Sequence, residues 1–168
     1  QMAAQAEAAD AAPYVIFETS LGAFSVELYS QHAPQSCKNF RELARTGYYD
    51  STTFHRVIRG FMAQGGDVEK HNGAGKGISI YGRTFADEEA SLNFDQCGVV
   101  AMAATKGQDA NGCQFFVSLG EAPWLDGKHV AFGRVSAGLD VLRAIEERGS
   151  AHGRTRGVVV IANCGQLQ

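Results

Sequence analysis

The stretch Phe54–Asp67, FHRVIRGFMAQGGD, gathers the residue types in this chain that are best suited to chemistry. A guanidinium, an aromatic ring, a thioether and a primary amide lie within the nine residues from Arg56 to Gln64. Large apolar side chains exclude water, while a fixed cation and an amide hold a polar group at the edge of an apolar surface. This stretch therefore predicts an apolar slot with one cation and one hydrogen-bonding group at its rim.

The environment of Arg56 depends on whether this stretch is extended. In a strand, Phe54, Arg56 and Ile58 share one face, so the cation is surrounded by large apolar side chains. The alternative is a surface arginine on an edge strand, and the pattern alone favours neither interpretation.

Alternation also decides which side chains after Gly60 can meet. It places Met62 and Gln64 on one face and Phe61 on the other. All three line one slot only if the bend at Gly60 or a local bulge re-aims one of them.

The remaining candidate motifs favour structural interpretations. In Gly73–Gly77, GAGKG, the third glycine is one position early for a dinucleotide-binding loop, and the ISI that follows favours a strand over a helix. The five histidines lack zinc-ligand spacing, and no G-x-S-x-G nucleophile motif is present. No C-x-x-C pair occurs, so we expect reduced thiols rather than disulfides at all four cysteines, which are Cys37, Cys97, Cys113 and Cys164.

Length and composition predict one soluble domain. A chain of 168 residues with 45% hydrophobic and 20% charged residues can bury a sizeable core. The net charge of −3 and the lack of a Lys/Arg run argue against nucleic-acid binding, and no segment has the length and apolarity of a membrane span.

The alanine-rich start, residues 1–12, contains Glu7 and Asp10 but no basic residue. It therefore lacks the features of a secretory signal or a mitochondrial presequence. We expect a flexible tail over residues 1–12 and a folded domain over residues 13–168. We also expect a cytoplasmic location, with the nucleus as the second option.

Hydrophobic periodicity and turn residues predict eight strands and two helices. The helices are expected at Pro34–Thr46, with Gly47 as its stop, and from a Ser136 cap to Arg148, with Gly149 as its stop. The strands are expected at Tyr14–Thr19, Phe24–Leu28, Thr53–Ile58, Phe61–Gly65, Gly98–Ala103, Phe115–Leu119, His129–Val135 and Val158–Cys164. Because strands and helices do not alternate, the fold class is mainly β, a closed eight-stranded antiparallel barrel capped by two α-helices.

Several of these segments resemble, in order, the signature segments of the cyclophilins, which are peptidyl-prolyl cis-trans isomerases. The resemblance covers about Tyr14 to Leu167, nearly the whole chain. Its strongest parts are FHRVIRGFMAQGGD, NGCQFF (Asn111–Phe116) and WLDGKHVAFGRV (Trp124–Val135). SIYG (Ser79–Gly82), NFRELA and the terminal NCGQL are similar as well.

The resemblance implies a substrate groove on the outer face of the barrel, with a role for each matching residue. Arg56 would be catalytic, and Gln64 and Gln114 would bond the substrate backbone. The walls of the proline pocket would be Phe61, Met62, Phe116 and Leu125, with His129 at the far side of the proline ring, Trp124 at the rim, and Gly73, Ala103 and Ala104 along the groove. Trp124 is also the residue that accompanies cyclosporin binding in this family.

Two departures from the family pattern bear on selectivity. Ala104 stands where many relatives carry asparagine. Arg83, Thr84 and Cys113 stand at the gate of a neighbouring secondary pocket, which implies a side-chain preference unlike that of close relatives.

The resemblance implies an isomerase that acts on X-Pro bonds of peptides and proteins and assists protein folding. It needs no cofactor and no metal, and its partners would be proline-containing peptides and proteins and cyclosporin. We expect a monomer that binds neither nucleic acid nor membranes. The alternative is a proline-peptide binding module in a multiprotein assembly such as the spliceosome.

Overall fold

The computed structural model describes residues 14–75, 77–89, 92–104 and 107–167 of the chain. The tail predicted at residues 1–12 lies outside these ranges, as do Lys76 of the glycine-rich loop and the first two residues of the loop after Ala104.

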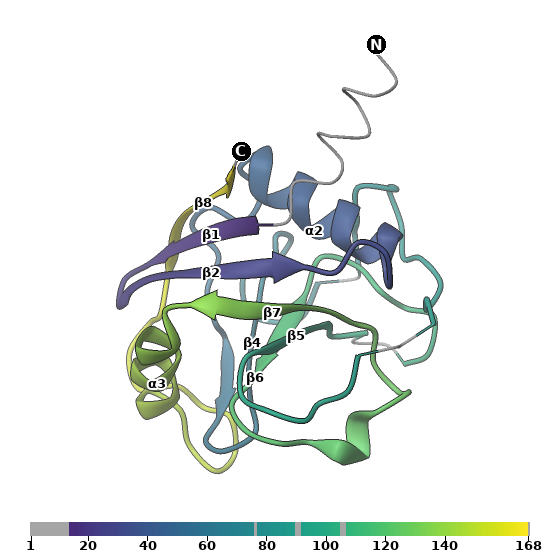
Figure 1. The fold of residues 1–168 in the computed structure, drawn as a ribbon. Helices are drawn as coiled ribbons and strands as arrows, with labels where there is room; N and C mark the ends of the chain where they lie inside the picture. Colours follow the sequence, from purple (N-terminus) through teal and green to yellow (C-terminus); the bar gives the residue numbers. More distant parts are fainter. Residues whose placement is uncertain (1–13, 76, 90–91, 105–106, 168) are drawn as a thin grey trace.

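The described residues form one strongly curled sheet of eight antiparallel strands (Figure 1). The order of the strands in the sheet is β3-β4-β6-β5-β7-β2-β1-β8. The strands are β1 (Tyr14–Thr19), β2 (Gly22–Leu28), β3 (Arg56–Ile58), β4 (Met62–Gly65), β5 (Val99–Met102), β6 (Phe115–Ser118), β7 (Ala131–Ala137) and β8 (Ile161–Leu167).

The two ends of the sheet meet just before β3 and β8. Thr53 forms an isolated bridge with Val160, and the backbone N–H of Ile161 donates to the carbonyl of Thr52 at 2.8 Å. These bonds close the curled sheet around its core, so the predicted eight-stranded antiparallel barrel is confirmed.

Two helices pack against the barrel. Helix α2 (Pro34–Arg45) contacts β7 and β8, whereas α3 (Leu139–Glu147) contacts β2, β3 and β4 (Figure 1). A short 3-10 helix, η1 (Pro123–Leu125), lies in the loop before β7. No helix within the described ranges is long and apolar enough to cross a membrane.

The start of α2 is stabilised by a residue far away in sequence. Ala33 precedes the helix and offers no side-chain cap. The carboxylate of Glu88 instead accepts hydrogen bonds from the backbone N–H groups of Gln35, at 2.9 Å, and Ser36, at 2.7 Å. This contact joins the loop that carries Glu88 to the helix end, where an anion is favoured.

The predicted start of the second helix, at Ser136, is wrong. Strand β7 continues through Ala137, and α3 begins at Leu139 after Gly138, which has a φ of 93°. A Cβ at Gly138 would lie 2.6 Å from the carbonyl oxygen of Ala23, so the chain turns where only glycine fits. The hydroxyl of Ser136 is bonded to that of Ser25 at 2.9 Å instead.

Two apolar clusters lie on opposite faces of the central strands. Val100 and Met102 of β5 belong to the large barrel core, whereas Val99 and Ala101 belong to a smaller second cluster. Because both faces are covered, every residue of β5 and β6 is buried. The second cluster contains Met62, Phe94, Val99, Ala101, Phe116, Ala122 and Ala131.

Candidate functional site

A small cleft of about 110 Å³ lies over the second cluster, on the outer face of the barrel. It brings together eight residues that the sequence predicts for the site. They are Arg56, Phe61, Met62, Gln64, Ala103, Phe116, Leu125 and His129.

The register of four neighbouring strands places three of these side chains in a row. Arg56 of β3 lies opposite Gln64 of β4, and Gln64 lies opposite Phe116 of β6. Phe116 in turn pairs with Ala101 of β5. Residues directly opposite each other on antiparallel strands present their side chains on the same face. The ladder therefore positions the guanidinium, the amide and the aromatic ring together.

The predicted common face of Phe54, Arg56 and Ile58 is only partly correct. Strand β3 begins at Arg56, so Phe54 lies before the regular ladder and is buried in the barrel core. Arg56 lines the cleft and Ile58 packs against the second cluster, on the outer face.

Phe61 enters the cleft because the turn at Gly60 re-aims it. Gly60 has a φ of 74°, and the N–H of Phe61 donates to the carbonyl of Ile58 at 3.0 Å, which closes a tight turn before β4. Phe61 is therefore outside the strand alternation and can face the same cleft as Met62. The ring of Phe61 also packs against Trp124 at a centroid distance of 5.7 Å.

The ring of Phe116 is fixed from two sides. Phe94 stacks on it at 5.8 Å with an interplanar angle of 10°, and His129 meets it edge-on at 5.3 Å and 89°. The Nδ1 atom of His129 lies 3.1 Å from the carbonyl oxygen of Met102, within hydrogen-bond distance. Two neighbouring rings and a backbone contact therefore position the aromatic wall of the cleft.

The charged group of Arg56 is available to a ligand. Arg56 is exposed, and no ion pair with it occurs among the described residues. Its aliphatic stem packs against Gly153, where a Cβ would lie 2.8 Å from Cγ of Arg56. Gly153 is held in turn, because its carbonyl accepts a hydrogen bond from the N–H of Val57 at 3.0 Å.

A chain of side-chain hydrogen bonds fixes the amide groups. Gln64 donates through Nε2 to Oε1 of Gln114 at 3.0 Å, and Gln114 donates to the carbonyl of Gly73 at 3.3 Å. Gln114 is almost fully buried, so its amide connects Gln64 to the loop that contains Gly73. Gly73 cannot be replaced without a shift, since a Cβ there would lie 2.6 Å from Nε2 of His55.

Asp67 organises that loop from inside. It is fully buried, and its carboxylate accepts four backbone N–H bonds of 2.9–3.1 Å, from Glu69, Lys70, Gly73 and Gly75. Burial alone would raise the pKa of Asp67, but the four donors outweigh it and hold the pKa below its usual value. The loop therefore depends on the ionised form of this carboxylate.

The half-buried His55 borders the same loop. Burial lowers its pKa, although the nearby carboxylate of Asp67 acts in the opposite direction. The neutral imidazole is accordingly favoured beside the guanidinium of Arg56.

The other predicted site residues surround the cleft without lining it. Trp124 lies at its rim on η1 and is 56% exposed. Ala104 follows Ala103 with a φ of 41°. Asparagine adopts this left-handed conformation more readily than alanine does.

The predicted gate residues are divided between two places. Arg83 and Thr84 line another open cavity, of about 460 Å³, beside Gln35 and Tyr81. Cys113 is buried in the barrel core and lines neither this cavity nor the cleft, and burial raises the pKa of its thiol to about 11. All four cysteines are free.

Two residues that position the site are not indicated by the sequence patterns used above. Gly153 supports the stem of Arg56 from a segment almost a hundred residues away, and no local motif marks it. Asp67 ends the stretch FHRVIRGFMAQGGD, but its role is indicated only by the glycines at positions 73 and 75, whose N–H groups can approach a carboxylate closely.

The arrangement can hold a small apolar ring and place one cation beside the polar bond attached to it. Phe61, Met62 and Phe116 provide the apolar surface, and Arg56 and Gln64 provide hydrogen-bond donors at its edge. Within the described residues, no group of three or more His, Cys, Asp or Glu side chains is placed to hold a metal ion.

Known proteins are similar to this chain in sequence over most of its length. The pattern of the cyclophilin type peptidyl-prolyl cis-trans isomerases matches residues 14–166. Human peptidyl-prolyl cis-trans isomerase-like 1 is 52% identical over 135 residues, 79% of this chain and 79% of that protein. The Neurospora crassa protein of the same name is 53% identical over 131 residues, 77% of this chain and 78% of its own length.

A solved structure extends the similarity to three dimensions. A cyclophilin type peptidyl-prolyl cis-trans isomerase of Cryptosporidium parvum, crystallised in the presence of the dipeptide Ala-Pro, superposes with a TM-score of 0.85 at 37% identity. The superposition covers 92% of this chain and 99% of that one.

Proposed function

Because this chain belongs to the cyclophilin family of peptidyl-prolyl cis-trans isomerases, we propose that Arg56 is its catalytic residue and that the outer cleft holds the substrate proline. The single observation that supports this best is the register row, in which Arg56, Gln64 and Phe116 lie opposite one another. A cation, an amide and an apolar wall are then within reach of one X-Pro bond.

The reaction requires the amide to lose its planarity. Rotation about an X-Pro bond crosses a barrier of about 18–20 kcal/mol, because amide resonance is lost in the twisted state. The proline nitrogen then regains a lone pair, which accepts a hydrogen bond from the guanidinium of Arg56. This bond is absent from both planar isomers, so it stabilises the transition state selectively. Arginine suits the role since it stays charged and carries several donors.

The guanidinium alone is not sufficient. A hydrogen bond to a charged group contributes roughly 1.5–3 kcal/mol, which is about ten- to a hundredfold in rate. The remainder comes from positioning: Phe61, Met62, Phe116 and Leu125 hold the proline ring while the preceding carbonyl turns. Gln64 and Gln114, whose amides are bonded to each other, anchor the substrate backbone, and His129 lies behind the ring.

The substrates we propose are X-Pro bonds in peptides and proteins, with assistance to protein folding as the cellular role. The Cryptosporidium relative crystallised with Ala-Pro supports the substrate class. Trp124, exposed at the rim and packed on Phe61, supports cyclosporin binding in the same cleft. The cytoplasmic location and the monomeric state stay predictions from the sequence.

NMR exchange spectroscopy on a short X-Pro peptide tests the proposal directly. The protein should speed cis-trans exchange, cyclosporin should suppress the effect, and Arg56→Ala should remove most of it. Arg56→Lys is the matched control, because it keeps the charge but loses the planar group of donors. If Arg56→Ala isomerised the peptide as fast as the unchanged chain, the proposed role of Arg56 would be wrong. A proline-peptide binding module in a multiprotein assembly would bind its peptide equally well with either residue.

A further inference from the structure

A second concave surface lies between α2 and the loop that contains residues 78–82, away from the isomerase cleft. This groove has a volume of about 550 Å³ and is lined by eleven residues, none of which lines the cleft. Its apolar walls include Leu43, Tyr48, Val68, Ile78, Ile80 and Tyr81. Cavities that bind ligands commonly have volumes of about 300–1,000 Å³.

The groove exposes apolar surface that the described residues leave partly uncovered. Tyr48, Ile78 and Tyr81 are 60%, 40% and 42% exposed. They are half of the six large apolar residues that the described part of the chain leaves exposed, and all three line this one groove. Apolar residues gathered in a patch mark interaction sites, whereas single ones do not.

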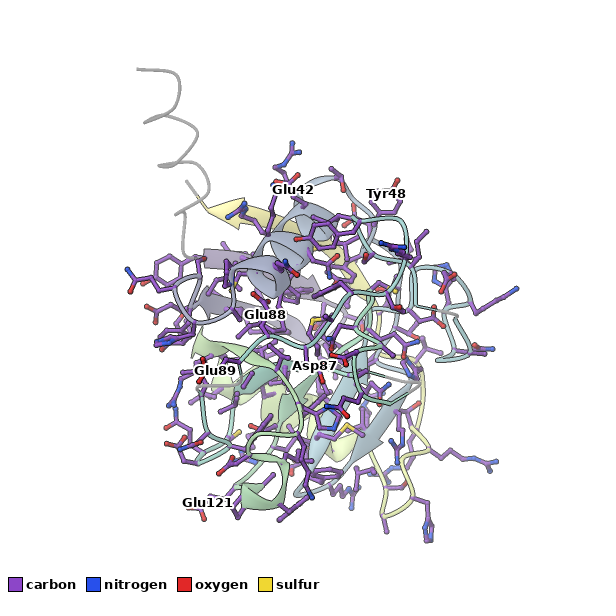
Figure 2. The ribbon with its side chains drawn as sticks, turned by 90° about the vertical axis from the view of Figure 1, so that its right-hand side faces the viewer. Glu42, Tyr48, Asp87, Glu88, Glu89 and Glu121 are labelled. Atoms are coloured by element: carbon purple, nitrogen blue, oxygen red, sulfur yellow. The ribbon has the colours of Figure 1, made fainter. Side chains whose placement is uncertain are left out.

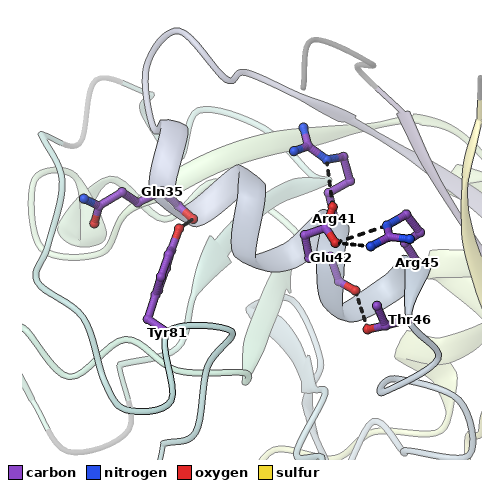
Figure 3. Close-up of polar contacts among 6 residues, drawn as sticks. All are labelled: Gln35, Arg41, Glu42, Arg45, Thr46 and Tyr81. Carbon is purple, nitrogen blue, oxygen red and sulfur yellow. Dashed lines mark hydrogen bonds and ion pairs between the residues drawn. The ribbon is translucent and has the colours of Figure 1, made fainter. Parts of the chain in front are cut away.

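The walls of the groove are fixed to each other. The N–H of Ile80 donates to Oδ1 of Asn39 on α2 at 3.0 Å, and the amide of Asn39 donates to the carbonyl of Gly112 at 2.8 Å. The hydroxyl of Tyr81 donates to the carbonyl of Gln35 at 3.0 Å (Figure 3). The loop is therefore attached to the helix at two points, and the groove is formed before a ligand arrives.

The charges along the groove favour an acidic ligand. Lys38 lines it, is exposed, and has no ion pair with any described residue. Glu42 also lines it, but its carboxylate lies 2.6 Å from the guanidinium of Arg45 and 3.9 Å from that of Arg41 (Figure 3). One cation is thus left without a counter-charge.

Two of the acidic residues on the same side of the molecule already accept hydrogen bonds from other parts of the chain. Figure 2 shows Asp87, Glu88 and Glu89 below Glu42 and Tyr48 in that view. Glu88 is already bound by the first N–H groups of α2, and Asp87 accepts a bond from the amide of Asn111 at 2.7 Å.

We propose that this groove docks a short segment of a partner protein that combines a bulky apolar side chain with an adjacent carboxylate. The apolar side chain enters between Leu43 and Ile80, and the carboxylate pairs with Lys38. A second copy of the chain is a poorer occupant, because a stable interface needs about 20–30 residues a side and this groove offers eleven. The chain's own residues 1–12 carry acidic groups, but Met2 is their only bulky apolar side chain.

The experiment uses the full chain and a defined peptide. The peptide has twelve residues, with two leucines next to two glutamates and no proline, so that it is not an isomerase substrate. A matched peptide carries glutamine in place of each glutamate. Titration of the ¹⁵N-labelled protein should shift the amides of Lys38, Tyr48 and Ile78–Gly82 and leave those of the cleft unchanged. An exposed ion pair raises the affinity by up to about fivefold, so the glutamine peptide should bind up to about fivefold more weakly.

Matched variants separate the groove from the isomerase site. Lys38→Glu should weaken binding of the glutamate peptide more than the change from glutamate to glutamine in the peptide does. The rate of X-Pro isomerisation should stay unchanged. Lys128→Glu changes the net charge equally at an exposed position outside the groove and should leave peptide binding unchanged. Arg56→Ala should slow isomerisation by about ten- to a hundredfold and leave peptide binding intact, so this inference and the proposed function fail independently.

Four results would overturn the proposal. They are no shifts in the groove at millimolar peptide, equal binding of the two peptides, shifts centred on the cleft, and groove shifts that follow protein concentration without peptide. The last result would assign the groove to contacts between copies of this chain. Ile78→Ser, at a 40% exposed position that should tolerate the change, must also weaken peptide binding.

Discussion

The cleft is the smaller of the two surfaces, but it carries the more reactive set of side chains. The cleft of about 110 Å³ holds the exposed guanidinium of Arg56 in register with Gln64 and Phe116. The groove is about five times larger, at about 550 Å³, but it presents only one unpaired ammonium group and no row of donors. Volume therefore identifies a surface that can be filled, whereas the ordered donors identify a surface that can react.

The two surfaces also differ in what supports them. The cleft lies on four strands of the sheet, and its walls belong to a buried cluster, with Met62 and Phe116 only 3% and 5% exposed. The groove lies between a helix and a loop, and Tyr48 at its edge is 60% exposed. A catalytic site needs precise positions, which the strand ladder supplies. A docking surface tolerates softer walls.

Truncation of one wall residue of the cleft and one of the groove provides the strongest test of this difference. Phe116→Ala should lower the free energy of unfolding by about 3–5 kcal/mol, because it leaves a cavity between Phe94 and His129. Tyr48→Ala should change it by less than about 0.5 kcal/mol, since an exposed surface side chain is removed. Urea unfolding followed by circular dichroism measures both, and similar values for the two variants would refute the contrast.

Asp67 links the two surfaces, so its loss should affect both. Asp67→Asn replaces an acceptor of four backbone N–H bonds by a group with one acceptor oxygen, and it should cost about 2–3 kcal/mol of stability. Gly73 on one side of the loop holds Gln114, and Val68 lines the groove. Isomerisation and peptide docking should therefore weaken together. The rate of cis-trans exchange of an X-Pro peptide measures the first, and titration with the glutamate peptide measures the second.

The same residue gives a pH dependence of known sign. The folded pKa of Asp67 is depressed, so its contribution to stability is fully present above the unfolded value of about 3.9. That contribution is lost as the pH falls through the folded pKa. Stability measured from pH 6 to pH 3 should drop more steeply for the unchanged chain than for Asp67→Asn. Parallel curves would show that Asp67 does not titrate with folding.

Removal of the guanidinium of Arg56 should impair the cleft and leave the groove unaffected. Arg56→Ala should lower kcat/KM by about ten- to a hundredfold, equal to roughly 1.4–2.7 kcal/mol, because one charge-assisted hydrogen bond in the transition state is lost. Its stability should hardly change, as Arg56 is exposed and has no ion pair in the described chain. Lys38→Glu should have the reverse profile, with unchanged kcat/KM and weaker docking. A variant that lost both activities would remove the distinction.

Half of the cleft was predictable from one stretch of sequence, because four of its eight lining residues lie between Arg56 and Gln64. Alternation placed Met62 and Gln64 on one face, but it left open whether Arg56 belongs to an apolar site or to an exposed edge strand, and the pairing of Arg56 with Gln64 settles this. The re-aiming of Phe61 could be stated only as a condition, since periodicity does not report the conformation at Gly60. Phe116, Leu125 and His129 were assigned by resemblance, because pairing between distant strands leaves no local pattern.

The groove and the supports of the cleft were not predictable by these means. Lys38 and Ile78 belong to segments forty residues apart, and each looks like an ordinary surface residue within its own segment. The contact between Gly153 and Arg56 depends on how the loop after α3 bonds to β3. The shifted start of α3 depends on the approach of Gly138 to Ala23, a tertiary contact that overrides the capping preference of Ser136.

The smallest expected effects come from backbone strain beside each surface. At the cleft, Ala104 has a φ of 41°, a left-handed conformation that an alanine adopts at a cost. At the groove, Gly82 has a φ of 84°, and a Cβ there would meet nothing within 4 Å. Strain is thus present at the rim of the reactive surface and avoided at the docking surface.

Exchanging the two residue types should shift stability in opposite directions. Ala104→Gly should raise the free energy of unfolding by about 0.5–1 kcal/mol, because relief of strain exceeds the added entropy of the unfolded chain. Gly82→Ala should lower it by a similar amount, with no steric contribution to confuse the result. Thermal and urea unfolding of both variants provide the measurement. If Ala104→Gly were destabilising, its left-handed conformation would not be strained, and the cleft would owe its geometry to the strand ladder alone.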